Sequence, residues 1–213
     1  MQLYEKYRPR HLDDVIGQEK AVKILHRLMA RDDWDRDALW IEGPSGTGKT
    51  SLALAVANEL GADRHNVHEI DGDKLDKATR DDLEQRFQYA AWGNGVRVIV
   101  VNEAHAIPRQ AVQWLLTALE RIPSRTYWIF TTTEEIREDL FGEFSRPLAS
   151  RCKLLRLTSQ GLAPKFAARA REIAQAEDLD GQPEKAYVRL VQECRNNMRL
   201  VLQRIEMGEM LEK

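Results

Sequence analysis

A glycine-rich loop that ends in lysine and threonine constrains this chain more than any other feature. Residues 43–50 read GPSGTGKT and match the pattern GxxxxGK[ST]. The apolar residues 38–42 before the loop predict a short buried strand, and residues 51–60, SLALAVANEL, have the composition of a helix. A strand, a glycine loop and a helix in this order predict a phosphate-binding turn.

The residues of the loop also indicate which ligand it binds. Its glycines let backbone N–H groups close around phosphates, and the N-terminus of the following helix favours negative charge. Lys49 is expected to reach the β- and γ-phosphates, and Thr50 to ligate magnesium. The sequence therefore predicts ATP and Mg²⁺ as cofactors. The loop residues predicted to contact the nucleotide are Gly43, Pro44, Ser45, Gly46, Thr47, Gly48, Lys49, Thr50 and Ser51.

Strand and helix patterns alternate along most of the chain. Strands are predicted at residues 38–42, 67–71, 96–101, 126–133 and 153–157, and further helices at 21–29, 78–91 and 108–121. Such alternation implies a parallel sheet covered by helices on both faces. From residue 160 onward only helical patterns remain. We predict an α/β domain at residues 1–158, followed by a small all-helical domain at residues 159–213.

Composition and charge exclude several classes of protein. With 43% hydrophobic and 31% charged residues the chain has a globular composition, and its formal net charge of -2 gives no global basic field. No apolar run approaches the roughly 18 residues of a membrane span, so we expect a cytoplasmic protein without membrane contact. Cys152 and Cys194 form no CxxC pair, and His65 with His68 lacks further metal ligands nearby.

The predicted strand at 96–101 ends in an unusual polar pair. P-loop ATPases usually place an aspartate there for the magnesium shell, then a glutamate that orients the attacking water. In this chain Glu103 supplies the glutamate, but Asn102 stands at the aspartate position. An amide still accepts a hydrogen bond from a magnesium-bound water, yet it lacks the negative charge. We therefore expect weaker metal binding and slow hydrolysis.

Several stretches in a fixed order carry a family resemblance. They are EKYRPRHLDDVIGQEKAV at 5–22, GPSGTGKT at 43–50, VNEAHAIPRQAVQWLLTALE at 101–120, FTTTE at 130–134 and ASRC at 149–152. In order and spacing they resemble the AAA+ ATPase subunits of DNA sliding-clamp loaders, both the replication factor C small subunits and the bacterial polymerase III loader. The resemblance implies a P-loop AAA+ domain with a helical lid. It also implies other loader subunits, a sliding clamp and primed DNA as partners.

The resemblance assigns catalytic roles to matching positions. Thr133, with Thr132 as the near alternative, matches the sensor at the end of the fourth strand. Arg151 of the SRC motif matches the arginine that reaches the ATP of an adjacent subunit, although on its own it reads equally as a surface residue. Arg199 matches the second sensor, placed over the γ-phosphate of its own subunit.

Two further contacts are implied by matching position. The segment that encloses adenine in relatives matches Tyr7, Pro9, Val15, Ile16, Gly17 and Gln18. Arg109 begins the helix after NEAH, where clamp loaders present a positive side chain to the DNA backbone. Its alternative interpretation is an ordinary solvated helix start.

The chain also departs from the family pattern. Loaders usually carry a third, helical collar domain after the second sensor, which we do not expect here, and the bacterial zinc cluster is missing. Extra residues at 136–149 could reposition Arg151. Two alternatives therefore stay open beside a clamp-loader ATPase: a weakly hydrolysing, nucleotide-dependent scaffold, and another AAA+ DNA machine such as a branch-migration motor.

Overall fold

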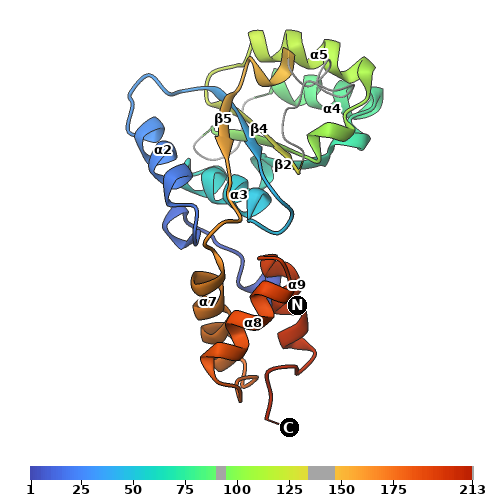
Figure 1. The fold of residues 1–213 in the computed structure, drawn as a ribbon. Helices are drawn as coiled ribbons and strands as arrows, with labels where there is room; N and C mark the ends of the chain where they lie inside the picture. The colour runs from blue at the N-terminus through green and yellow to red at the C-terminus, as the bar shows by residue number, and fades with distance from the viewer. Residues whose placement is uncertain (90–94, 134–146, 213) are drawn as a thin grey trace.

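A computed structural model describes residues 1–89, 95–133 and 147–212 of the chain. Its described residues contain a parallel sheet with the strand order β2-β3-β4-β1-β5 (Figure 1). This confirms the predicted α/β P-loop architecture. The strands are β1 (Asp37–Glu42), β2 (Val67–Asp71), β3 (Arg97–Asn102), β4 (Thr126–Thr132) and β5 (Lys153–Arg156).

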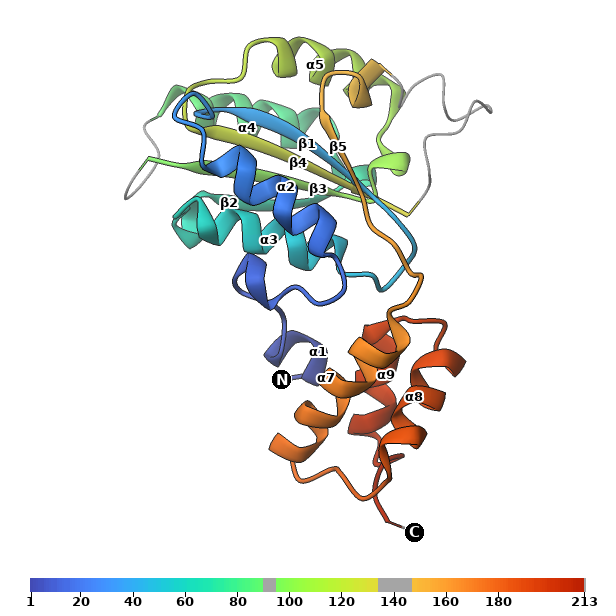
Figure 2. The ribbon, with the colours of Figure 1, turned by 60° about the vertical axis from the view of Figure 1, so that its left-hand side comes forward.

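Helices cover both faces of the sheet, as Figure 2 shows. Side chains alternate between the two faces along each strand, so Leu39 and Ile41 of β1 join one core while Ala38 and Trp40 join the other. The first core is completed by α2 (Glu19–Met29) and α3 (Lys49–Glu59). The second is completed by α4 (Lys77–Gln88) and α5 (Arg109–Glu120). Short 3-10 turns lie at Leu12–Asp14, Arg64–Asn66, Gly72–Lys74 and Ala104–Ala106.

A separate helical body follows the last strand. It consists of α7 (Ala163–Ala176), α8 (Glu184–Glu193) and α9 (Met198–Glu206), which share their own apolar core (Figure 1). The domain limits at 158 and 159 stay a prediction. The structure adds one feature that they do not capture: α1 (Leu3–Lys6) buries Leu3 in the core of the helical body, although the sequence interpretation assigned it to the α/β domain.

The direction of the strands decides which residues meet. All strand pairs are parallel, so the carboxyl ends of β1, β3 and β4 lie at one edge of the sheet. The loop at 43–50 leaves β1 there, next to Asn102 and Thr132. Arg151 precedes β5 and therefore lies at the side of the sheet formed by the amino ends of the strands. None of the helices in the described ranges is long and apolar enough to cross a membrane.

Candidate functional site

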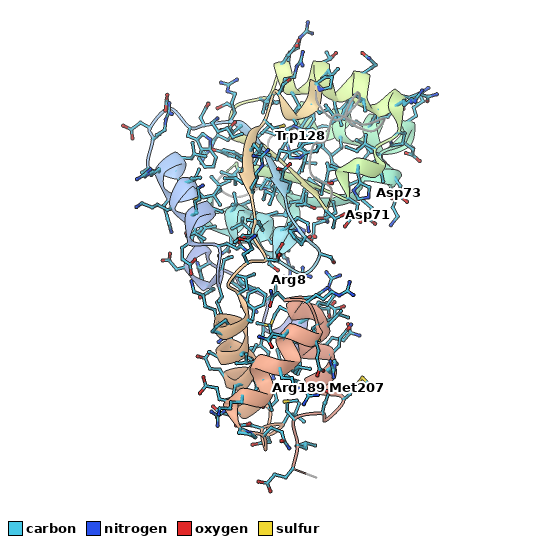
Figure 3. The ribbon with its side chains drawn as sticks, in the orientation of Figure 1. Arg8, Asp71, Asp73, Trp128, Arg189 and Met207 are labelled. Atoms are coloured by element: carbon cyan, nitrogen blue, oxygen red, sulfur yellow. The ribbon has the colours of Figure 1, made fainter. Side chains whose placement is uncertain are left out.

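A cavity of about 400 Å³ lies between the α/β domain and the helical body. Figure 3 shows Arg8, one of its lining residues, at the narrow region between the two bodies. The cavity brings together most of the predicted site. The predicted residues that line it are Tyr7, Pro9, Val15, Ile16, Ser45, Gly46, Thr47, Gly48, Lys49, Thr50, Ser51, Glu103, Thr133 and Arg199.

Other predicted residues do not line this cavity. Gly43, Pro44 and Asn102 lie just outside it, at the base of the glycine loop. Gly17 and Gln18 are buried and do not line the cavity either. The cavity is also lined by residues for which the sequence predicted no role, and these lie in or next to α1, α7 and α9. Among these are Tyr4, Arg8, Phe166, Arg169, Ile173, Asn197 and Met198.

The glycine loop folds around its own lysine. Lys49 is only 7% exposed, and its Nζ donates to the backbone oxygens of Gly43 and Pro44, both at 2.8 Å. Burial lowers the pKa of Lys49 from 10.5 to about 8; the positive charge of Arg199 adds to this effect, and the negative charge of Glu103 opposes it. Burial thus destabilises the charged form of Lys49 at the N-terminus of α3. An anion bound beside it would stabilise that charge.

Asn102 is held by two threonine hydroxyls. Its Oδ1 accepts hydrogen bonds from Thr50 Oγ1 at 3.0 Å and from Thr131 Oγ1 at 2.9 Å. Because the amide oxygen takes both protons, the Thr50 oxygen keeps its lone pairs for a cation, which fits a magnesium ligand. Asn102 itself brings no charge to this position. Among the described residues there is no cluster of three or more His, Cys, Asp or Glu side chains that could hold a metal ion.

Glu103 follows Asn102 in a left-handed backbone conformation, with φ 51° and ψ 51°. Its carboxylate lines the cavity and lies 3.5 Å from His105 Nδ1. The same ring nitrogen lies 3.1 Å from the hydroxyl of Thr132, which is buried, whereas the next residue, Thr133, lines the cavity. Of the two threonines proposed for the sensor, Thr133 is thus the one that borders the cavity. The sequence predicted no role in the site for His105.

Two arginines of the helical body lie over tyrosines of the N-terminal segment. The guanidinium of Arg199 sits 5.3 Å from the ring centroid of Tyr4, and that of Arg169 sits 6.0 Å from the ring of Tyr7. The Tyr7 hydroxyl in turn donates to Glu177 at the end of α7. Both arginines also line the cavity, so the helical body contributes positive charge to its wall.

A family model gives the chain its place among known proteins. The model described as "ATPase family associated with various cellular activities (AAA)" matches residues 39–156, which is more than half of the chain. The chain belongs to this AAA family of ATPases. The matched range contains the glycine loop, Asn102, Glu103 and Arg151, so it includes the sheet edge that faces the cavity and the opposite edge as well.

Curated relatives of this AAA protein include subunits of replication machines. The replication factor C small subunit of Halobacterium salinarum is 30% identical over 180 residues, which are 83% of this chain and 53% of the relative. The DNA polymerase III subunit tau of Bacillus subtilis is 27% identical over 202 residues, with 83% and 34% covered. These relatives confirm the resemblance to clamp-loader ATPase subunits. The chain spans about half the length of the replication factor C small subunits.

Solved structures show the same AAA architecture. The chain superimposes on the Holliday junction branch migration motor RuvB of Thermotoga maritima with a TM-score of 0.73 and 25% identity, covering 94% of this chain and 64% of that one. A T158V variant of the same protein gives a TM-score of 0.73 at 26% identity, again over 94% and 64%.

Two predicted residues of the AAA domain lie away from the cavity. Arg151 donates from Nη2 to Glu120 Oε1 at 2.7 Å, from Nε to the same oxygen at 3.2 Å, and from Nη1 to Pro147 O at 3.0 Å. It borders a second hollow of about 400 Å³ at the amino edge of the sheet, together with Arg36 and Arg121. Arg109 is exposed at the first position of α5. The extra residues proposed at 136–149 lie mostly outside the described residues.

Proposed function

We propose that this chain is an ATP-binding subunit of a DNA sliding-clamp loader, in which ATP binding and hydrolysis are coupled to clamp loading during DNA replication. The observation that carries the proposal is the glycine loop of an AAA domain facing, across one cavity, the arginines of a helical lid. Relatives among the replication factor C small subunits support the clamp-loader assignment. ATP and Mg²⁺ are the cofactors of the proposed reaction.

Each wall of the cavity takes one part of the nucleotide in this proposal. The adenine packs on Tyr7, Pro9, Val15 and Ile16, and the phosphates lie on the N–H groups of the glycine loop. Lys49 exchanges its bonds to two backbone carbonyls for bonds to phosphate oxygens, and Arg199 approaches the γ-phosphate from the lid. Thr50 holds magnesium, which when bound neutralises charge on the phosphates.

The hydrolytic step uses residues at the carboxyl edge of the sheet. Glu103 accepts a hydrogen bond from the attacking water. As the water oxygen bonds to the γ-phosphorus, the bond from that phosphorus to the β–γ bridging oxygen breaks and its electron pair goes to ADP. The proton that the water loses passes through Glu103 to solvent, and ADP and phosphate leave. In this proposal Thr133 senses the γ-phosphate or the attacking water, which its position in the cavity lining supports. His105 holds the Glu103 carboxylate near the end of β4, which restricts its orientation.

The partner contacts of the proposal use the other edge of the sheet. Arg151 cannot line its own nucleotide site, because it precedes β5 while the glycine loop follows the parallel strand β1. In this proposal its guanidinium exchanges the bonds to Glu120 for bonds to the γ-phosphate of an adjacent subunit. Arg109 is proposed to contact the DNA backbone, and the sliding clamp and other loader subunits complete the assembly.

Calorimetric titration with ATP and magnesium tests the binding step. We expect saturable binding by the isolated chain, and ATP hydrolysis that rises when partner subunits, a sliding clamp and primed DNA are added together. Absence of ATP binding contradicts the nucleotide assignment. Binding without any response to clamp or primed DNA contradicts the clamp-loader assignment alone.

Specific observations keep the two other candidates in view. The neutral Asn102, whose oxygen is shared by Thr50 and Thr131, favours a nucleotide-dependent scaffold with little turnover. The likeness to RuvB favours a branch-migration motor. Steady-state hydrolysis with and without DNA separates the scaffold from the ATPase. Strand exchange on a four-way DNA junction, measured with this chain as the only ATPase, separates the motor from the loader.

A further inference from the structure

Gln18 is a buried polar residue that the nucleotide cavity does not use. It is 3% exposed and occupies the N-cap position of α2, yet its side chain makes no capping bond there. Its carboxamide instead bonds backbone groups from distant parts of the chain. Nε2 donates to Thr158 O at 2.9 Å and to Thr47 O at 3.4 Å, and Oε1 accepts from Thr158 N at 3.1 Å.

The two partners of Gln18 belong to different functional parts. Thr47 lies in the middle of the glycine loop, where its hydroxyl donates to Pro44 O, the same oxygen that Lys49 Nζ contacts. Thr158 lies in the connection between β5 and α7, which is the covalent link to the lid. Gln18 is therefore bonded both to the loop that would bind phosphate and to the link that carries the lid.

The lid holds the same connection from its own side. Asn196 Nδ2 donates to Ser159 O at 2.8 Å, next to the residue that Gln18 holds. The preceding backbone at Gly17 is also tied to the lid: its φ is +78°, and an added Cβ would lie 2.3 Å from Leu162 Cδ2. The connection thus has little freedom to shift without moving Gln18.

The chemistry of the contacts requires a carboxamide. One acceptor must meet the Thr158 N–H, and donors must meet two carbonyl oxygens, so only a side chain with both functions satisfies all of them. A carboxylate has no donor, and a thioether has neither a donor nor a strong acceptor. Buried backbone groups that lose their partner destabilise the arrangement that contains them.

We infer that Gln18 is a positioning residue that couples the state of the glycine loop to the orientation of the helical lid. The inference rests on the proposed function, since nucleotide binding is the event that is coupled. The bond to Thr47 reaches the glycine loop itself, so a phosphate that reorders the loop acts on this bond directly. Because the same amide holds Thr158, that change is passed to the lid connection.

Amide hydrogen exchange measured by NMR on the full chain tests the inference. In the nucleotide-free protein, Gln18→Met removes the acceptor of the Thr158 N–H, and we expect that amide to exchange roughly tenfold faster. ATP binding should slow exchange in α7 of the wild type. In Gln18→Met this slowing should be lost, while ATP affinity falls by only a few-fold because Lys49 and the loop remain.

Gln182→Met is the matched control. It also removes a side-chain amide bond to a backbone oxygen, from Nε2 to Leu211 O at 2.9 Å, but it lies at the far end of the lid. We expect it to keep the ATP response of α7. If Gln18 contributes only to stability, both variants should show the wild-type slowing of exchange in α7 on ATP binding, and they should differ only in melting temperature.

The outcomes separate this inference from the proposed function. A wild-type chain that binds no ATP overturns both. A wild type that binds ATP, with Gln18→Met showing the same slowing in α7, overturns the coupling alone. Should Gln18→Met fail to fold, Gln18→Glu tests the ATP response of α7 alone, because it keeps an acceptor for the Thr158 N–H and loses the donors to Thr47 and Thr158.

Discussion

Lys49 offers a quantitative test of the site, because burial moves its pKa into an accessible range. A pKa of about 8 in place of 10.5 corresponds to roughly 3 kcal/mol at about 1.36 kcal/mol per pKa unit. The side chain is 7% exposed, so solvent screening reduces this figure only modestly. Replacing the lysine by methionine, which keeps most of its apolar length, removes the titration.

The sign of the effect follows from proton linkage. The unfolded chain binds a proton at Lys49 up to pH 10.5, whereas the folded chain releases it near pH 8. Between these pH values the unfolded state holds more protons, so folding stability rises with pH. We expect the free energy of unfolding of the wild type to gain up to about 3 kcal/mol relative to Lys49→Met between pH 7 and pH 10.5.

Urea unfolding of both proteins at several pH values, without nucleotide, measures this difference. Taking the variant as reference cancels the contributions of tyrosines and other lysines that titrate in the same range. The protonation of Lys49 should also control ATP affinity. We expect Lys49→Met to lose nearly all affinity for ATP. In the wild type the affinity should fall above pH 8, where the lysine is neutral. If the difference in unfolding free energy between wild type and variant stays constant from pH 7 to pH 10, burial does not destabilise the charged form of Lys49 and this interpretation is refuted.

Substitutions at three further residues test other parts of the proposed function. Asn102→Asp should raise magnesium-dependent hydrolysis about tenfold or more, since a carboxylate supplies the missing charge; unchanged rate and magnesium dependence, measured in steady state, would place the residue outside the metal shell. Arg151→Ala should leave ATP binding by the monomer intact and lower turnover in the assembly. In mixing experiments its defect should appear at the neighbour's site, and a defect that stays at the variant's own site argues against the trans role. Tyr4→Leu should weaken ATP binding by a few-fold through the loss of the Arg199 contact, which is worth about 0.5–1 kcal/mol, while Tyr4→Phe should bind normally in the same titration.

The sequence was sufficient for the fold because local patterns and the motif agree. The central strands β1, β3 and β4 are short and buried, the longer helices have helical composition, and the glycine loop predicts which end of the strands binds phosphate. Parallel strands then place Asn102 and Glu103 beside that loop without further information. Position along the chain was therefore enough to predict this half of the cavity.

Contacts between distant segments were not predictable in the same way. The helix at Leu3–Lys6 is only one turn long, so it has no periodicity that shows it packing on the lid. Thr131 falls inside an apolar strand, and only the sheet register brings it to Asn102. Gln18 was assigned to the adenine wall by its position in a motif, but its side chain turns toward Thr47 and Thr158. Side-chain direction at such places depends on packing that a single sequence does not encode locally.

Positive charge is concentrated around the cavity. The whole chain has a formal net charge of -2, yet the residues lining the cavity include many more cations than acids. The cations are Lys6, Arg8, Arg10, Lys49, Arg169 and Arg199, and the acids are Asp14 and Glu103. They come from the N-terminal segment, the glycine loop and the lid, so their mutual repulsion opposes closure of the two bodies. We therefore expect a polyanion bound among them, such as the phosphates of a nucleotide, to offset that repulsion and to favour approach of the lid to the sheet.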